Sequence, residues 1–164
     1  MAPPPLLLYP APAITESVVS IMELIEREIL SDAEESDWGL FHTRWSVASH
    51  FPMETEAAVI DRCRIAMSKL VENGLVRLYW LSYRHATEEE AVAERKRLEE
   101  EVGFRTQRDV MMSVNDAIPT TEVEAILADD ANWHPPVEDR YVAFAATEAG
   151  LKAYFALPPR QTSA

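Results

Sequence analysis

The segment from Thr55 to Tyr83 constrains the fold most, because it predicts a helix, a stop and a strand in immediate succession. Thr55 can cap the amino end of the helix, and Asn73-Gly74 can end it because glycine readily adopts a left-handed conformation. From Val76 onward the side chains alternate with a period of two, which predicts a strand that folds back beside the helix. The apolar residues at helical spacing are Val59, Cys63, Ala66, Met67 and Leu70.

Such a strand needs a partner, and the best candidate lies far along the chain, at Arg140 to Ala146. This second segment is also short, apolar and aromatic. The phrase TEAG that follows it begins at Thr147, which can cap a further helix. We therefore expect two strands that are remote in the sequence to pair with each other.

The order of these elements resembles that of bacterial winged helix-turn-helix regulators. The resemblance rests on LVENGLV between helix and strand and on TEAG after the second strand, and it covers residues 38–84 and 138–157. It implies a mostly α fold with a small antiparallel β-hairpin (α+β). In that fold the helix from Thr55 would be the recognition helix and the two strands would form the wing. The departure from the family is a long insertion between the wing strands.

We divide the chain into a proline-rich arm at 1–13, a single domain at 14–157 and a tail at 158–164, with a helical insertion at about 85–138. The elements expected before the recognition helix are a helix from Thr15 to Leu30, an acidic loop from Ser31 to Asp37 and a helix from Trp38 to Phe51, with Trp38, Phe41, Trp45 and Val47 as core candidates. In the insertion we expect capping boxes at Thr87–Glu90 and Thr121–Glu124 and a strand or short helix at Arg108–Val114. The helix that Thr87 opens is polar with a thin apolar edge, which suits projection from the body or packing against a second chain. Trp133 is expected to anchor the loop that returns to the second strand, beside a surface His134.

The distribution of charge separates one segment from the rest of this acidic chain. The net charge is −13, yet residues 42–86 carry six bases against four acids. Residues 1–41 carry eight acids against one base, and residues 87–164 carry sixteen acids against eight bases. The only positive segment is the one that resembles the DNA-reading half, as in a nucleic-acid binder with acidic flanks. A balance of +2 over this length is equally compatible with chance.

The resemblance implies a DNA-binding transcriptional regulator that acts as a homodimer, paired through the first helices or the inserted ones. The amino half of the recognition helix would enter the major groove, where Arg62 and Arg64 could read bases or hold phosphates. The complete set of DNA-binding candidates is Arg44, Thr55, Arg62, Arg64, Lys69, Arg77 and Arg84.

The alternative hypothesis is an acidic protein–protein interaction module on the same scaffold, without DNA binding. Glu56 and Asp61 would repel phosphate at the surface that DNA should approach. An acidic surface suits a basic protein partner instead. Both hypotheses stay open at the level of sequence.

Enzymatic and metal chemistry find little support in the sequence. The four histidines are widely spaced, Cys63 lies on an apolar helix face, and four glycines leave no phosphate-binding loop. We therefore expect no enzyme, cofactor or metal. A single cysteine and the lack of a signal-peptide pattern indicate a cytoplasmic protein.

Overall fold

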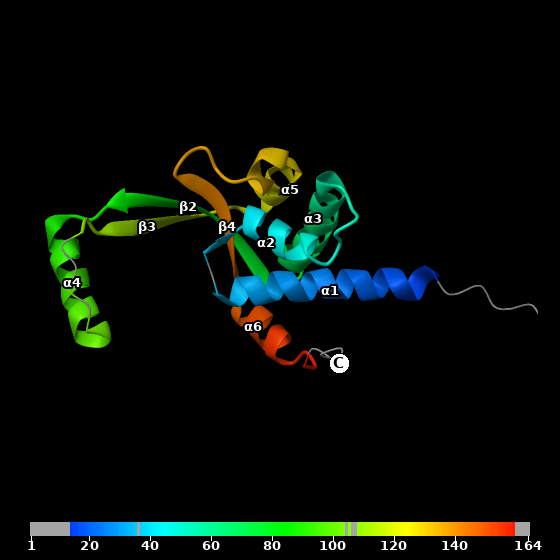
Figure 1. Ribbon diagram of the computed structural model, residues 1–164, viewed down its shortest axis with the longest axis horizontal. Helices are drawn as coiled ribbons and strands as arrows, with labels where there is room; N and C mark the ends of the chain where they lie inside the picture. Colours follow the sequence, from blue (N-terminus) through cyan, green and yellow to red (C-terminus); the bar gives the residue numbers. More distant parts are fainter. Residues whose placement is uncertain (1–13, 36, 104, 106–107, 160–164) are drawn as a thin grey trace, which may run out of the picture.

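The computed structural model describes residues 14–35, 37–103, 105 and 108–159, and these form an α+β fold with six α-helices and a four-stranded antiparallel sheet (Figure 1). The helices are α1 (Ile14–Glu35), α2 (Leu40–Ala48), α3 (Glu56–Glu72), α4 (Glu88–Val102), α5 (Thr120–Ala128) and α6 (Glu148–Phe155), with a short 3-10 helix η1 (Asp130–Trp133). The strands are β1 (Trp38–Gly39), β2 (Val76–His85), β3 (Met111–Ala117) and β4 (Arg140–Ala146).

The two remote strands pair as expected. β2 and β4 run antiparallel, with Val76 opposite Ala146 and Ser82 opposite Arg140. The sheet is larger than the expected hairpin, because its strand order is β1-β4-β2-β3. β1 lies on the free side of β4, where Trp38 faces Phe144, and β3 lies on the free side of β2.

The main core forms where α1, α2 and α3 pack against one another and onto the inner face of β2 and β4. The buried stripe of α3 contains all five residues expected from its helical spacing, and it also includes Ile60. Cys63 is fully buried there, and burial raises the pKa of its thiol to about 12, which fits a small core residue. A second, smaller cluster on the other face of the sheet contains Tyr79 and Leu81.

The two sequence phrases that carry the resemblance meet in space. Gly74 ends α3 with a φ of +69°, and the carbonyl oxygen of Leu75 then accepts a hydrogen bond from the Thr147 backbone N–H at 3.0 Å. Thr147 caps α6, since its side chain accepts from the Gly150 N–H at 3.1 Å. A Cβ atom on Gly150 would lie 1.9 Å from the Leu75 oxygen. Glycine at position 150 therefore allows α6 to lie directly against the α3–β2 junction.

The inserted segment builds an arm that leaves the body of the molecule (Figure 1). β2 and β3 form a ribbon with His85 paired to Met111 at its outer end, and α4 stands at that end, away from the other helices. The expected capping box is confirmed: the Thr87 side chain accepts from the Glu90 N–H, and the Glu90 carboxylate accepts from the Thr87 N–H. Of the two arrangements expected for this polar helix, the structure shows projection from the body, with α4 standing apart from the other described helices; packing against a second chain stays untested.

Two expectations for the first half of the chain were wrong. The acidic stretch after Leu30 is no loop, because α1 continues to Glu35. Ala33 is buried in the core one turn beyond Ile29, and this packing holds the last turn in the helix despite its acids. The helix expected from Trp38 to Phe51 is shorter, since residues 38–39 form β1 and α2 ends at Ala48. The open edge of β4 explains the strand, because it offers hydrogen-bonding partners that sequence spacing cannot show.

The core residues expected in α2 were correct except for one tryptophan. Phe41 and Val47 are buried and Trp38 packs against the core, whereas Trp45 is 51% exposed. Periodicity alone placed Trp45 inward. In the structure its ring contacts the neighbouring rings of Phe41 and His42 on the surface of α2.

The second half of the insertion follows the expected outline with one error. The segment around Met111 is a strand, shifted toward Ala117, and Trp133 is fully buried with its indole N–H donating to the Leu127 carbonyl at 2.9 Å. The capping box at Thr121–Glu124 was wrong. The N-cap of α5 is Pro119, two residues before Thr121, and it makes no side-chain cap hydrogen bond. The hydrogen bond from the Ile118 N–H to the Leu78 carbonyl fixes where the chain leaves the sheet.

The proline-rich arm, the side chain of Thr15 and the last residues of the tail lie outside the described residues.

Candidate functional site

The outer face of α3 is the surface that was predicted to bind DNA. Thr55 caps the helix, with its hydroxyl oxygen accepting from the Ala58 N–H at 3.2 Å. The buried stripe packs on α1 and α2, which turns a row of exposed residues outward. That row contains Ala57, Asp61, Ile65, Lys69 and Glu72. Ile65 is 61% exposed in the middle of this face.

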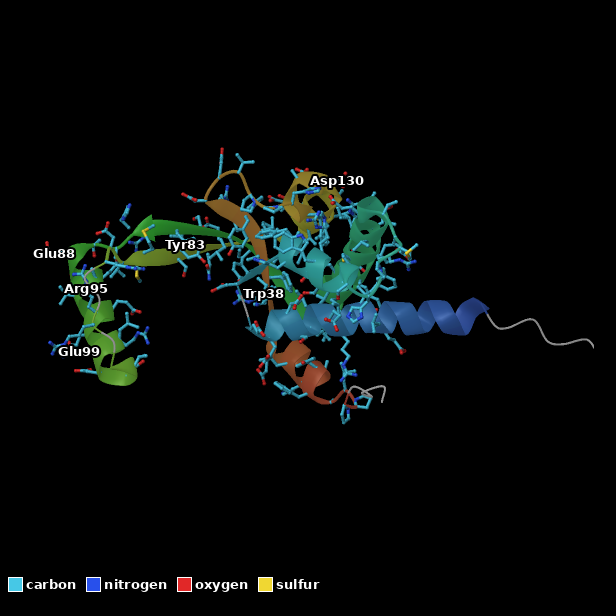
Figure 2. All side chains as sticks on the ribbon, in the orientation of Figure 1. Trp38, Tyr83, Glu88, Arg95, Glu99 and Asp130 are labelled. Carbon is cyan, nitrogen blue, oxygen red and sulfur yellow. The ribbon has the colours of Figure 1, made fainter. Side chains whose placement is uncertain are left out.

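Arg64 is held by the inserted segment. Its Nε donates to the Leu127 carbonyl at 2.7 Å, and its terminal nitrogens contact Asp61 and Asp130 at 2.7 Å each. The inserted helix α5 therefore lies beside α3, and the carboxyl end of α5 is joined to α3 through this guanidinium. Figure 2 shows Asp130 at this end of the body, far from the labelled α4 residues.

Arg62 and Lys69 are also paired with acids of the same chain. Arg62 makes a two-pronged contact to Glu54, with N–O distances of 2.8 and 2.6 Å. Arg62 donates both hydrogen bonds to the Glu54 carboxylate, and these bonds raise the pKa of Arg62 and lower the pKa of Glu54. Lys69 contacts Glu26 of α1 at 2.6 Å, and this contact raises the pKa of Lys69.

Arg44 is the most buried of the candidate cations. Its side chain is 9% exposed and contacts Glu56 at 2.8 Å, while His134 lies 3.3 Å from a guanidinium nitrogen. His134 also lies 3.4 Å from Glu56. The His134 side chain is 44% exposed, as expected of a surface residue, and it also joins a small cluster that ties η1 to the start of α3.

The remaining candidates lie apart from α3. Arg84 makes a two-pronged pair with Glu90 on the arm, at 2.8 Å for both contacts. Arg77 is exposed on β2 and stacks over the ring of Tyr79. The structure thus gathers Arg44, Thr55, Arg62, Arg64 and Lys69 along α3 and leaves Arg77 and Arg84 elsewhere.

Acids outnumber bases around the outer face of α3. Eight acids from the α2–α3 turn, α3, α5 and η1 stand near four bases, a local balance of −4. The acids are Glu54, Glu56, Asp61, Glu72, Glu122, Glu124, Asp129 and Asp130, and the bases are Arg44, Arg62, Arg64 and Lys69. The segment that is positive along the sequence therefore becomes part of an acidic surface once the insertion folds against it.

An open groove of about 440 Å³ runs between α3 and α5. Ile65, Leu127 and Ala128 contribute its apolar surface, and Ser68, Glu72 and Glu124 also line it. These three polar residues line a second hollow of about 400 Å³ further along the same two helices. No motif in the sequence marks this groove. Only the spacing of Val123 and Leu127 signalled that α5 has a face to bury.

Within the part of the chain that the structure describes, no group of three or more His, Cys, Asp or Glu side chains could hold a metal ion. Over the same residues, no helix has the length and apolar character needed to cross a lipid bilayer. The chain matches no protein-family model, no curated protein and no solved structure.

Proposed function

We propose that this chain is a protein-docking module on a winged-helix scaffold, with the outer face of α3 as its docking surface. The scaffold is supported by the order α1-β1-α2-α3-β2-β4 and by the pairing of β1 with β4. In this proposal α3 occupies the place of a recognition helix, β2 and β4 are the wing strands, and α4 to η1 are the insertion. A fold of this kind does not fix a function, so we argue the function from the chemistry of the α3 surface.

One observation carries the choice of a protein partner: the cations of α3 are already paired with acids of the same chain. Arg62, Arg64 and Lys69 each contact at least one carboxylate within 2.7 Å. DNA would meet a surface with a local balance of −4, which opposes the approach of phosphate. A protein with basic residues meets the same surface favourably.

DNA binding is a second candidate, because the ion pairs of α3 are partly exposed. Such pairs contribute only about 0.2–1 kcal/mol each, so phosphate could replace the carboxylates at small cost. Arg77 and Arg140 also have no acidic partner within the described residues, but cross-strand pairing places them on opposite faces of the sheet. They therefore do not form one continuous basic surface with α3.

The two candidates are separated by a DNA titration. We expect the full chain to give no anisotropy change with a labelled random-sequence duplex at 50 mM salt. A regulator that neutralises four to five phosphates would bind, with a log–log salt slope of about −4. Such binding, lost in the double variant Arg62→Ala and Arg64→Ala, would overturn the docking proposal.

Protein docking is tested by capture with surface variants. Proteins captured by the wild-type chain should be lost with Asp61→Lys, which reverses an exposed charge on α3. They should be retained with Val92→Ser, which alters an exposed apolar residue of α4. Equal capture by all three chains would place docking away from α3.

A further inference from the structure

We infer that the groove between α3 and α5 binds a short amphipathic helix with a basic edge. The inference rests on the proposed docking function and names its partner by chemistry. The groove is built by the insertion, since α5 supplies one wall and α3 the other.

The shape of the groove fits a helix. Arg64 on α3 lies by the carboxyl end of α5, and Val71 and Glu72 lie by Thr120 and Val123, so the two walls run antiparallel. The two hollows share Ser68, Glu72 and Glu124 and together follow α3 over residues 64–72. Eight helical steps span roughly 12 Å, which matches the length between apolar anchors at positions i and i+7 of a bound helix.

The apolar part of the groove offers an anchor site. Ile65 is 61% exposed although it is a large aliphatic residue, and it lies across the groove from Leu127 and Ala128. An apolar side chain of the bound helix would remove this surface from water. Apolar anchors commonly dominate helix-in-groove binding.

The charge of the groove selects a basic partner. Arg64 and Lys69 are both matched by carboxylates of this chain. Glu72 and Glu124 line both hollows, and within the described residues neither carboxylate has an ion-pair partner. Two uncompensated negative charges therefore border the apolar surface, and lysine or arginine beside the apolar face of the bound helix would complement them.

The test is selection of peptides from a display library of random 16-residue sequences on the immobilised full chain. We expect enriched peptides with apolar residues spaced i, i+4, i+7 and an excess of lysine and arginine. Their affinity should fall on the order of 10-fold with Ile65→Ser and with the double variant Glu72→Lys and Glu124→Lys. All three positions are exposed, so urea midpoints equal to wild type would show that the variants fold.

A matched control is Val92→Ser, which removes an exposed apolar residue of similar size on the arm and should leave affinity unchanged. Enriched peptides that are acidic, or that bind the groove variants as tightly as wild type, would overturn the groove assignment while leaving protein docking intact. A library that yields no enriched peptide overturns the assignment, and docking by α3 is then decided separately by the Asp61→Lys capture. Duplex DNA binding that depends on Arg62 would remove both proposals.

Discussion

Replacing Gly150 with alanine tests the packing that joins the α3–β2 junction to the start of α6. Gly150 is the third residue of α6, and its amide donates to the Thr147 side chain. An added Cβ would lie 1.9 Å from the Leu75 oxygen and 2.9 Å from the Leu75 carbonyl carbon. Carbon–oxygen contacts normally begin at about 3.3 Å, so the two backbones would have to separate by roughly 1.4 Å.

The local hydrogen bonds oppose that separation. The Thr147 N–H donates to the same Leu75 oxygen, and its hydroxyl donates to the Gly74 carbonyl. Overpacking of this kind costs about 1–3 kcal/mol, and a lost hydrogen bond costs about 0.5–1.5 kcal/mol more. Alanine recovers up to about 1 kcal/mol of helix propensity. The net expectation is a loss of about 1–3 kcal/mol in the free energy of unfolding.

The measurement is urea unfolding followed by tryptophan fluorescence, with Ala149→Gly as the control. Ala149 is the exposed neighbour of Gly150 in the same turn, and its change to glycine should cost about 0.5–1 kcal/mol through propensity alone. Helix propensity alone predicts that Gly150→Ala raises the free energy of unfolding and that Ala149→Gly lowers it. The contact with Leu75 predicts instead that both variants are less stable than the wild-type chain. A Gly150→Ala chain as stable as wild type would refute the reasoning.

Four further outcomes are expected. Burial raises the pKa of Asp32, so the folded chain holds this proton more tightly and loses stability as pH rises from 3.8 through the raised value. Asp32→Asn keeps an acceptor for the Thr43 hydroxyl and should make the chain more stable at pH 7 than the wild-type chain. In urea titrations between pH 4 and 7, its free energy of unfolding should depend less on pH than that of the wild-type chain. Thr87→Ala removes the cap of α4 at a cost of about 1 kcal/mol. Because α4 stands apart from the other described helices, this loss should stay local. Amide hydrogen exchange should therefore rise in α4, while the urea midpoint of the whole chain stays unchanged. Trp133→Ala should cost about 3–5 kcal/mol in urea unfolding, because it empties a fully buried site and leaves the Leu127 carbonyl without the indole donor; a smaller loss would mean that η1 collapses onto α5. A homodimer is expected from the resemblance, and light scattering at micromolar concentration should give twice the mass of the chain; a monomer mass would reject it.

Several elements could be derived from residues alone because their signals are local. The helix from Thr55, its end at Gly74 and the capping box at Thr87 each depend on contacts within a few residues, and all three were correct. The pairing of β2 with β4 was also correct, because each strand needs a partner with the same apolar pattern. From the sequence, several candidate cations could be assigned to α3, and this assignment of function stays a prediction; their pairing with acids of the same chain could not be derived from the sequence.

The errors share a physical cause, which is that distant partners override local preference. The acidic end of α1 stays helical because Ala33 reaches the core, and Trp38 becomes a strand residue because β4 offers an open edge. Trp45 remains outside because α2 buries a different face.

The sequence by itself determined the helix-stop-strand unit and the caps at Thr55, Thr87 and Thr147, since capping, glycine conformation and apolar periodicity act over short distances. It also indicated the pairing of two remote strands, because both share the same short apolar pattern. Only the tertiary structure decided the character of the surface. It brought α5 and its acids beside α3, paired Arg64 with Asp130 sixty-six residues away, and left a groove beside an exposed Ile65. Charge adds up over space rather than along the chain, so a segment that is positive in sequence became one side of an acidic face.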